Sequence, residues 1–536
     1  MTYAIVTFLW LAVLPLWACI GFSSRRLRTF SRWRSATLAA IVVASIALTL
    51  EVFGPTFHGL EYEDAFEYVY AGLLMAVDET ARQQSLNPLC IRGSLNACES
   101  IATLSHPTGI ATLVSWMARA LGASNHYVHY ISAVSFTVSG IVGYSIGRLA
   151  SIPRRVAVAI PLLLFVTPSF HAIRVTSLSE PLSGTLVAAV VFLVLLQSDG
   201  QETKRTRLLI SLALATTVAL AVLVRRDNLL LPLAIPGSML VLSAPGSRRQ
   251  SFLTIGVPCL TGALIVLASS SIGDLAIVSN SSRAPFRVMN LIDLLPVFLR
   301  HVASIGRYGV LPLLVVVGCF SSIGTGAVRL CVALIVAYSG LFLLFGQSYY
   351  YEALQEVPTF HFERYVVELA PLLAVVGAAG LNMITEACRP WLPQSQLKSW
   401  SLGIVLLIVV SVPSVSAGGR IRREYASEEQ DTRTSPIARV CSTLPAGAEL
   451  VTEEPLLVGL FCGPAQRAIS FRALGRQIDQ DGLHKGSALY VVDSGTSVSV
   501  ERARYPVASQ LLDSFGYRSC NEFRSAGRTF RTCRVK

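Results

Sequence analysis

Long apolar runs that recur along most of the chain limit this sequence to few possible folds. Of its 536 residues, 53% are hydrophobic and 14% are charged, whereas an average soluble domain has about 25% charged residues. Apolar runs of about 17 to 25 residues, enough to cross the hydrocarbon core of a bilayer, recur up to residue 417 and are absent after it. The chain is therefore predicted to be a polytopic α-helical membrane protein.

These runs predict about twelve spans and two domains. A membrane domain is predicted for residues 1–420, and a soluble domain for residues 421–536. The first run lacks a preceding basic segment and is longer than the apolar part of a signal peptide, so it is predicted to be a retained helix. The predicted spans are residues 3–21, 36–53, 127–148, 156–172, 181–197, 208–224, 228–243, 251–270, 309–322, 328–346, 365–385 and 400–417.

Basic residues set the predicted orientation of the spans. Short basic clusters such as "RRLRTFSRWR", "GRLASIPRR" and "GSRRQ" occur in alternate connectors, which share one side of the membrane. By the positive-inside rule that side is cytoplasmic, so the net charge of +12 reflects topology rather than a nucleic-acid-binding face. The loop at 54–126 and the C-terminal domain are then extracytoplasmic, provided that residues 107–121 do not cross. This short segment contains Arg119 and is predicted to be an interfacial helix.

The 11 cysteines agree with this orientation. Disulfides persist on the oxidising side of a membrane, where six cysteines fall into three local pairs. Spacing does not prove pairing, and reduced structural cysteines are the alternative. The pairs are Cys90 with Cys98, Cys441 with Cys462, and Cys520 with Cys533, whereas Cys19, Cys259, Cys319, Cys331 and Cys388 are predicted to be free thiols.

The C-terminal domain is predicted to be a small α/β layer that starts near Thr434. Three short strand patterns, "AELVTE", "RAISF" and "ALYVVD", alternate with the helical patterns "PLLVGLF", "RALGRQI" and "ASQLLDSFG". A charged linker, "GGRIRREYASEEQD", precedes this region.

Acidic residues are concentrated in "GLEYEDAFEYVYAG", directly after a predicted span. Here Glu63 and Asp64 are candidates for a general base, or for ligands of a divalent cation that neutralises a phosphate. A solvated loop face is the alternative. The interleaved Phe66, Tyr68 and Tyr70 favour an interfacial helix.

Two further motifs lie on the same predicted side. In "SHPTG", His106 is suited to bonding a phosphate or orienting a carboxylate, with a purely structural histidine as the alternative. In "LVRRDNLLLP", Arg225, Arg226 and Asp227 occupy a tight turn between two spans, against the positive-inside trend. Such charges pair or bind a ligand, and arginine binds phosphate through a fixed fork of donors. Snorkelling at a helix end is the alternative.

A third polar group comes from two other predicted span ends. In "FHFERYVVELAPLL", His361, Arg364 and Tyr365 precede a span, and "RVTSLSEPL" supplies Glu180 and Arg174 at a similar depth. Each motif alone is weak. Their common predicted side makes them candidate parts of one site.

The order of "YEDAFEYVYAG", "SHPTGIATLVSWMARALG", "SLSEPLSGTLVAAVVFLVLL", "AVLVRRDNLLLPLAI" and "FERYVVELAPLLAVVGAAGL" resembles the GT-C superfamily of polyprenyl-phosphate-sugar-dependent glycosyltransferases. This superfamily includes protein O-mannosyltransferases, the aminoarabinose transferase of lipid A and mycobacterial arabinofuranosyltransferases. The resemblance covers most of residues 36–385, and "LPAGAELVTEEPLLVGLFCG" looks like the start of the superfamily's exterior domain.

The resemblance implies roles for several residues. An Asp of an acidic pair in the first exterior loop is catalytic in the superfamily, which implies a catalytic role for Asp64 or Glu63. The matches at Arg225 and Arg364 imply donor-phosphate binding, and Arg226 in the same turn is a third candidate for it. The matches at His106, Asp227 and Tyr365 imply supporting roles, and His361 and Glu180 are supporting candidates because of their predicted position at span ends.

The implied function is transfer of a sugar from a polyprenyl-phosphate donor to an acceptor hydroxyl, with inversion, at the extracytoplasmic face of a bacterial plasma membrane. The acceptor is a glycan, lipid or protein, and no nucleic acid is involved. No cofactor is required by the sequence; a divalent cation at Glu63 and Asp64 is compatible with it, although no full ligand set is present. A transporter or flippase, or an exterior polymerase or ligase of lipid-linked glycans, is the alternative. A transporter would carry ionisable residues near mid-membrane, where the predicted spans have almost none.

Overall fold

A computed structural model gives the arrangement of two units, each described here by itself. One unit comprises Met1–Phe57 and His129–Arg423, and the other His58–Val128 and Glu424–Lys536. The structure describes residues 2–25, 27, 68–69, 72, 75–76, 90–91, 108–122, 127–173, 179–198, 202–242, 248–269, 288–321, 326–345, 360–388, 449–452, 467–470, 489–493, 517–525 and 528–535.

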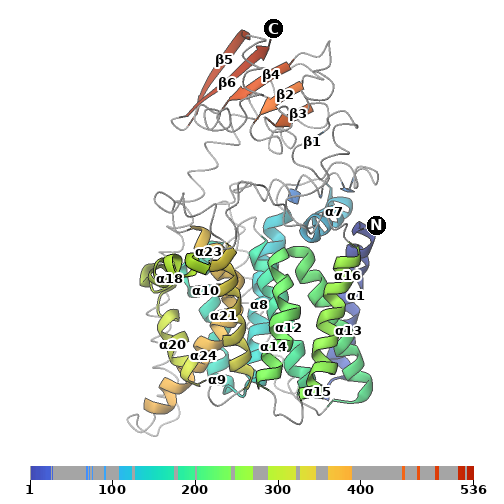
Figure 1. Cartoon of the computed structure of the whole chain (residues 1–536), viewed down its shortest axis with the longest axis vertical. Helices are drawn as coiled ribbons and strands as arrows, with labels where there is room; N and C mark the ends of the chain where they lie inside the picture. Colours follow the sequence, from blue (N-terminus) through green and yellow to red (C-terminus); the bar gives the residue numbers. More distant parts are fainter. Residues whose placement is uncertain are drawn as a thin grey trace. The chain divides into compact units, whose positions relative to one another are not determined.

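The first unit is a bundle of apolar helices (Figure 1). Seven helices in the described part of the chain are long and apolar enough to cross a membrane. The protein is therefore a polytopic helical membrane protein. These helices are α1 (Thr2–Ser23), α8 (Tyr127–Leu149), α12 (Glu180–Ser198), α13 (Lys204–Val224), the run of α15 (Arg248–Ser251), the π-helical turn η3 (Phe252–Gly256) and α16 (Val257–Ser269), then α21 (Gly326–Phe345) and α24 (Ala370–Cys388).

Shorter helices take the place of three predicted spans: 156–172, 228–243 and 309–322. The predicted span 156–172 is divided into α9, α10 and α11. The break between α10 and α11 lies at Thr167, which is extended because proline at position 168 disfavours the helical conformation in the residue before it. Spans 36–53 and 400–417 lie outside the described residues, so the total of twelve stays a prediction. The shorter helices are α9 (Arg154–Ala157), α10 (Ala159–Val166), α11 (Pro168–Ile173), η1 (Arg226–Leu230), α14 (Leu231–Leu242), α18 (Val288–Val302), α19 (Ile305–Tyr308), α20 (Leu311–Ser321) and α23 (Phe360–Glu368).

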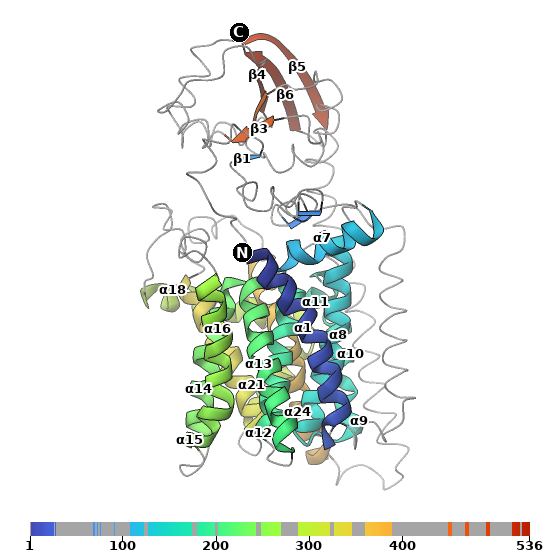
Figure 2. The same ribbon diagram turned by 90° about the vertical axis from the view of Figure 1, so that its right-hand side faces the viewer.

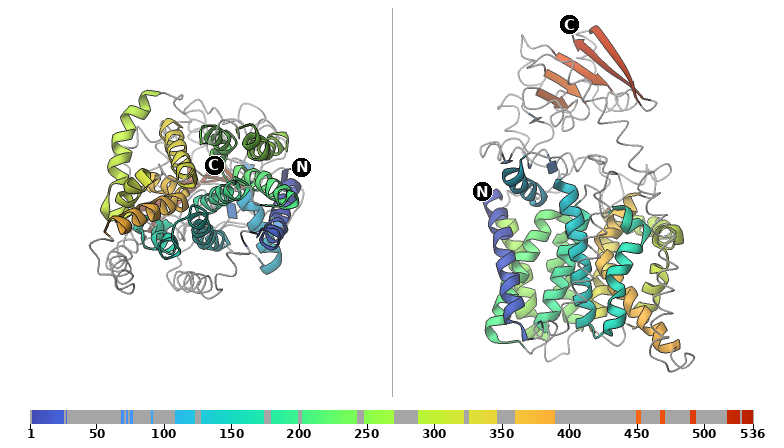
Figure 3. Two further views of the ribbon diagram at one scale, coloured as in Figure 1. Left: turned by 90° about the horizontal axis from the view of Figure 1, so that it is seen from below. Right: turned by 180° about the vertical axis from the view of Figure 1, so that it is seen from behind.

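Helix α12 lies at the centre of the bundle. Every residue from Glu180 to Val194 is buried, and α12 packs against α13, α23, α24 and α21. Viewed end-on in the left panel of Figure 3, the other helices surround this position. Outside this centre, α20 and α24 pack with their backbones in close contact. A Cβ added at Gly318 of α20 would lie only 2.0 Å from the carbonyl oxygen of Val376 in α24, so only glycine fits there. Small residues that let backbones approach are the usual means of packing helices in membranes.

Helix α1 is attached along one edge of the bundle (Figure 2). It packs on α13, and Trp17 stacks on Phe192 of α12 with ring centroids 5.6 Å apart. At its end, the hydroxyl of Ser24 donates to Glu202 Oε1 at 2.6 Å. Phe8 and Phe22 are exposed on its outer side, as expected of a helix that faces lipid.

The second unit contains a six-stranded sheet with the order β1-β3-β2-β4-β6-β5. Strand β2 pairs in parallel with β3 and β4, and the other pairings are antiparallel. The three predicted strands are confirmed as β2, β3 and β4; the helices predicted between them lie outside the described residues. The strands are β1 (Cys90–Ile91), β2 (Glu449–Thr452), β3 (Arg467–Ser470), β4 (Leu489–Asp493), β5 (Tyr517–Ser525) and β6 (Arg528–Val535).

The predicted loop at 54–126 contributes to this second unit in two places that were not predicted. Strand β1 joins the edge of the sheet by pairing with β3. The end of the acidic motif and the residues after it pack on α7 (Gly109–Leu121): Tyr68 and Met75 are buried, and Arg119 Nη2 donates to the carbonyl of Met75 at 2.9 Å. The helix predicted at 107–121 is thus confirmed as a helix, and its interfacial position stays a prediction.

The cysteines also bear on the predicted topology. The five cysteines that were predicted to be free thiols form no disulfide. Cys520 in β5 lies directly opposite Cys533 in β6. The side chains of the three predicted pairs are not among those that the structure describes, so the pairing stays a prediction.

Candidate functional site

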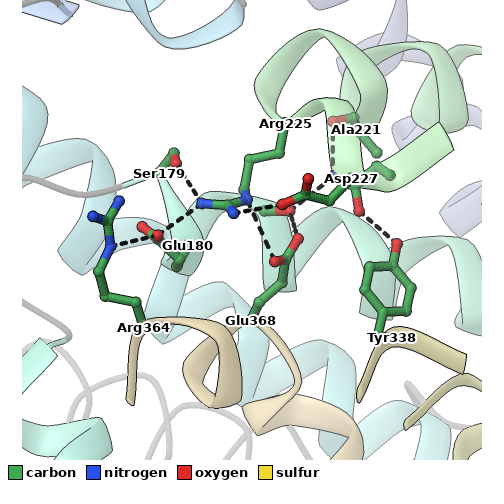
Figure 4. A network of polar contacts seen from close by, with 10 residues as sticks. Ser179, Glu180, Ala221, Arg225, Asp227, Tyr338, Arg364 and Glu368 are labelled. Carbon is green, nitrogen blue, oxygen red and sulfur yellow. Dashed lines mark hydrogen bonds and ion pairs between the residues drawn. The ribbon is translucent and has the colours of Figure 1, made fainter. Parts of the chain in front are cut away.

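A network of charged side chains lies where α12 begins, where α13 ends and where α23 meets α24 (Figure 4). Its centre is Arg225, the residue directly after α13, whose backbone is extended before η1 begins. Arg225 Nη1 donates to Glu180 Oε1 at 2.7 Å, and Nη2 donates to Asp227 Oδ2 at 2.6 Å. Nη1 also lies 3.2 Å from the hydroxyl of Ser179.

The carboxylate of Glu180 joins two guanidinium groups. Its Oε1 accepts from Arg225 and also from Arg364 Nε at 2.8 Å. Glu180 is the first residue of α12 and is fully buried, so its charge also interacts favourably with the positive end of the helix dipole. In Figure 4 the terminal nitrogens of Arg364 point away from this shared carboxylate.

A third carboxylate, that of Glu368, reaches Arg225 from α23. Glu368 Oε2 lies 3.4 Å from Arg225 Nε, and Oε1 accepts from the hydroxyl of Ser183 in α12. Tyr365, also from α23, lies with its ring centroid 5.3 Å from the Arg225 guanidinium, and Phe342 of α21 packs on that ring at 4.0 Å. The guanidinium of Arg225 is thus bounded by three acids and an aromatic ring.

Burial and charge shift the pKa values of this cluster in opposite senses. Burial lowers the pKa of Arg225, but Glu180, Glu368 and Asp227 raise it, and the result lies well above its ordinary value. Burial raises the pKa of Glu368 to about 7, against the lowering influence of Arg225. Arg225 therefore stays charged, whereas Glu368 changes charge near neutral pH. Removing one partner from such a buried ion pair typically costs about 3–5 kcal/mol.

The structure brings together five of the predicted site residues. Arg226 follows in η1 with a half-buried side chain. His361 lies in α23, but its side chain is outside the description, as are Glu63, Asp64 and His106 altogether. In the part of the chain that the structure describes, no group of three His, Cys, Asp or Glu side chains is placed to hold a metal ion. The five that meet are Glu180, Arg225, Asp227, Arg364 and Tyr365.

Sequence reasoning missed the polar residues beneath this cluster. Glu368 was detectable, because it follows Arg364 by four residues and that spacing puts both on one face of a helix. Asn228 was also detectable, because it directly follows Asp227 in the motif "LVRRDNLLLP". Ser183 and Tyr338 gave no signal, since a single hydroxyl within an apolar span is common.

Comparison with known proteins identifies the fold of the chain. No protein-family model matches the sequence, and no curated protein matches it. Among solved structures, ArnT from Cupriavidus metallidurans bound to undecaprenyl phosphate aligns over 93% of this chain and 98% of its own, with a TM-score of 0.57 and 11% identity. The archaeal oligosaccharyltransferase AglB from Archaeoglobus fulgidus, in complex with an inhibitory peptide and a dolichol-phosphate, aligns over 92% of this chain and 73% of its own, with a TM-score of 0.57 and 10% identity.

The chain has the GT-C fold. The resemblance inferred from the order of the motifs is thereby confirmed at the level of the fold. The GT-C alignments extend over more than nine-tenths of the chain, a larger part than residues 36–385 that carried the sequence resemblance.

Proposed function

We propose that the protein is a glycosyltransferase that moves a sugar from a polyprenyl-phosphate-linked donor to an acceptor hydroxyl, with inversion, on the extracytoplasmic face. The observation that carries this proposal is the pair of guanidinium groups held on the Glu180 carboxylate at one end of a GT-C bundle. A structure with the same fold holds undecaprenyl phosphate. Arginine is well suited to a lipid phosphate because its donors match two phosphate oxygens at once.

The membrane location explains why a lipid-linked donor is needed. A sugar carried on a membrane-embedded lipid reaches an active site at the bilayer surface without a soluble nucleotide. We place this site in a bacterial plasma membrane, within a bundle of about twelve spans, with the sheet of the second unit on the same side as the acidic loop. The acceptor is a glycan, lipid or protein that supplies a hydroxyl group.

The proposed reaction is a single displacement at the anomeric carbon. The acceptor oxygen gives its proton to Asp64 or Glu63 and forms the new bond to that carbon. The bond from carbon to phosphate oxygen breaks, and its electron pair leaves with the polyprenyl phosphate. Base catalysis contributes roughly 10²- to 10⁴-fold in rate. Attack opposite the leaving group inverts the anomeric centre.

The arginines have the second role in this scheme. The leaving phosphate gains a negative charge as the bond breaks, and prearranged cations stabilise that charge. We assign phosphate contact to Arg364 and Arg226 and, through the shared carboxylate, a supporting part to Arg225. We assign supporting parts to His106, Asp227, Tyr365 and His361, and a divalent cation at Glu63 and Asp64 would add positive charge.

The test is transfer of labelled sugar from a mixed pool of polyprenyl-phosphate sugars in membranes that contain the full chain. Asp64→Asn is expected to lower transfer by at least 100-fold at unchanged protein level, with Asp78→Asn in the same loop as the matched control. Full activity in Asp64→Asn excludes Asp64 as the essential base and moves the role to Glu63. Lipid-linked sugar that crosses the membrane without transfer would support the transporter alternative instead.

A further inference from the structure

The side chain of Asn228 joins the turn after α13 to three long helices. Its Nδ2 donates to Ser183 Oγ in α12 at 2.7 Å and to the carbonyl of Ala221 in α13 at 2.9 Å. Its Oδ1 accepts from the hydroxyl of Tyr338 in α21 at 2.5 Å. Asn228 lies in the middle of η1 and is fully buried, so these bonds form away from water, where an unmade hydrogen bond is costly.

The partners of Asn228 fix the orientation of its amide. A backbone carbonyl can only accept, so the atom that faces Ala221 must be the nitrogen. The oxygen then faces Tyr338, whose hydroxyl must donate. Ser183 accepts the second amide proton and gives its own to Glu368. Every donor in this set has an acceptor, and exchanging the amide oxygen and nitrogen would place two acceptors against each other at Ala221.

Asn228 also closes the backbone of the turn around Arg225. Arg225 is extended, and α13 ends directly before it. Its backbone N–H donates at 2.9 Å to the carbonyl of Ala221, the same oxygen that accepts from the Asn228 side chain. Its carbonyl accepts from the backbone N–H of Asn228 at 3.1 Å. Both backbone polar groups of Arg225 are therefore tied to Asn228, one directly and the other through a shared oxygen.

Helix α21 supports this turn at two points. The hydroxyl of Tyr338, which bonds to Asn228, points toward the turn in Figure 4. Phe342 lies four residues later, and residues at that spacing share one face of a helix. The ring of Phe342 packs on that of Tyr365 at 4.0 Å, and the Tyr365 ring lies 5.3 Å from the Arg225 guanidinium. The two contacts of α21 thus support both the backbone and the side chain of Arg225.

The turn held in this way carries charged groups of the candidate site. Arg225, Arg226 and Asp227 directly precede Asn228 in the chain. A shift of Asn228 therefore moves the backbone that carries them. The Arg225 guanidinium lies within 2.7 Å of Glu180 Oε1, and a contact of this length is lost with a small displacement of the turn.

We propose that Asn228 is a positioning residue of the lipid-phosphate site: it fixes the turn that presents Arg225 and Arg226, and Tyr338 supports it from α21. This inference rests on the proposed function. Asn228 is fully buried, so it acts through the turn and not by touching the donor lipid. The alternative is a polar contact that only stabilises helix packing, and its loss would affect all ligands of the bundle alike.

The experiment measures binding of undecaprenyl phosphate to the purified full chain in detergent, with undecaprenol, which lacks the phosphate, as the comparison ligand. Asn228→Leu keeps the approximate size of the side chain but removes its three hydrogen bonds. It is expected to weaken undecaprenyl phosphate binding roughly tenfold, the scale typical of residues that orient the ligands of a bound ion. Undecaprenol binding is expected to stay at the wild-type level, because undecaprenol has no phosphate for the arginines to contact.

Tyr338→Phe tests the same contact with a smaller change. It removes one hydroxyl, is expected to weaken undecaprenyl phosphate binding roughly two- to tenfold, and carries the test if Asn228→Leu does not fold. Because Tyr338 acts through Asn228, the double variant is expected to bind no more weakly than Asn228→Leu. The matched controls are Asn382→Leu in α24 and Tyr144→Phe in α8, which change the same residue types outside this set of bonds and are expected to bind like the wild type.

The two lipids separate the possible outcomes. Weaker binding of undecaprenyl phosphate with intact binding of undecaprenol supports the positioning role. If the wild type prefers undecaprenyl phosphate, folded variants that bind both lipids like the wild type, or that lose both equally, overturn the inference and leave the proposed function standing. A wild type without that preference overturns the proposed function, and the inference falls with it.

Discussion

The close contact between Gly184 and Glu368 gives the sharpest test of how packing supports the site. A Cβ added at Gly184 in α12 would lie 2.6 Å from the carbonyl oxygen of Glu368, whereas ordinary contacts begin at 3.4 Å. In Gly184→Ala, the start of α12 and the junction of α23 with α24 must therefore separate by about 0.8 Å, because backbone on both sides cannot swing away. The charged network is built across this contact.

The cost follows from that displacement. Overpacking of this kind typically costs about 1–3 kcal/mol, and the helix preference of alanine over glycine returns up to about 1 kcal/mol. The net loss of roughly 0–3 kcal/mol corresponds to a fall in Tm of up to about 6 °C, because each kcal/mol shifts the Tm of so long a chain by about 2 °C or less. The Arg225 Nε to Glu368 Oε2 distance of 3.4 Å also increases, and a misplacement on this scale can lower a reaction rate by roughly 100-fold.

The assay is thermal unfolding in detergent, followed by sugar transfer in membranes. The matched control is Gly340→Ala in α21, where an added Cβ meets nothing within 4 Å, and its Tm is expected to stay level or rise. If Gly184→Ala unfolds at the same temperature as Gly340→Ala and transfers sugar at the wild-type rate, the contact does not support the network and the reasoning fails.

Two further predictions concern regions away from the network. His301 donates to or accepts from Tyr308 Oη at 3.0 Å, and burial, with Arg307, lowers the pKa of the imidazole to about 4. The unfolded chain therefore binds a proton more tightly, so stability should fall as the pH drops from about 6.5 to about 4. His301→Asn should flatten this part of a Tm-against-pH curve, and an unchanged curve would contradict the assignment. Cys520 and Cys533 are opposite each other in β5 and β6, at a Cα separation that a disulfide can bridge. Protein isolated under oxidising conditions should resist thiol alkylation at both positions until it is reduced, and immediate labelling would contradict the pairing.

Apolar run length was enough to place most of the membrane helices. The predicted spans 181–197 and 208–224 correspond to Glu180–Ser198 and Lys204–Val224, because only a buried or lipid-facing helix tolerates such runs. The same criterion missed the division of 156–172, where the chain stays apolar through the break before Pro168. It also missed the β5–β6 hairpin, whose many arginines hide the alternation expected of a half-buried strand.

The site was predictable only to the extent that charge is unusual in such a chain. Arg225 and Glu180 were identified because charged residues at span ends are costly without partners. Their actual contacts depend on how far each helix is rotated and how deeply it is set, which a single sequence does not specify. The contact of Ser183 emerged only with the structure, because its hydroxyl bonds to Glu368, which lies 185 residues later in the chain.

The edge strand β1 has a consequence for biosynthesis. Residues 90–91 pair with residues 468–469, which leave the ribosome after roughly 380 more residues, or about 20–75 s later at 5–20 residues per second. During that interval the predicted loop at 54–126 has no sheet edge to join, and unpaired strand edges favour aggregation. Chains truncated before β3 should therefore depend on chaperones to protect this loop, even when the membrane helices are complete.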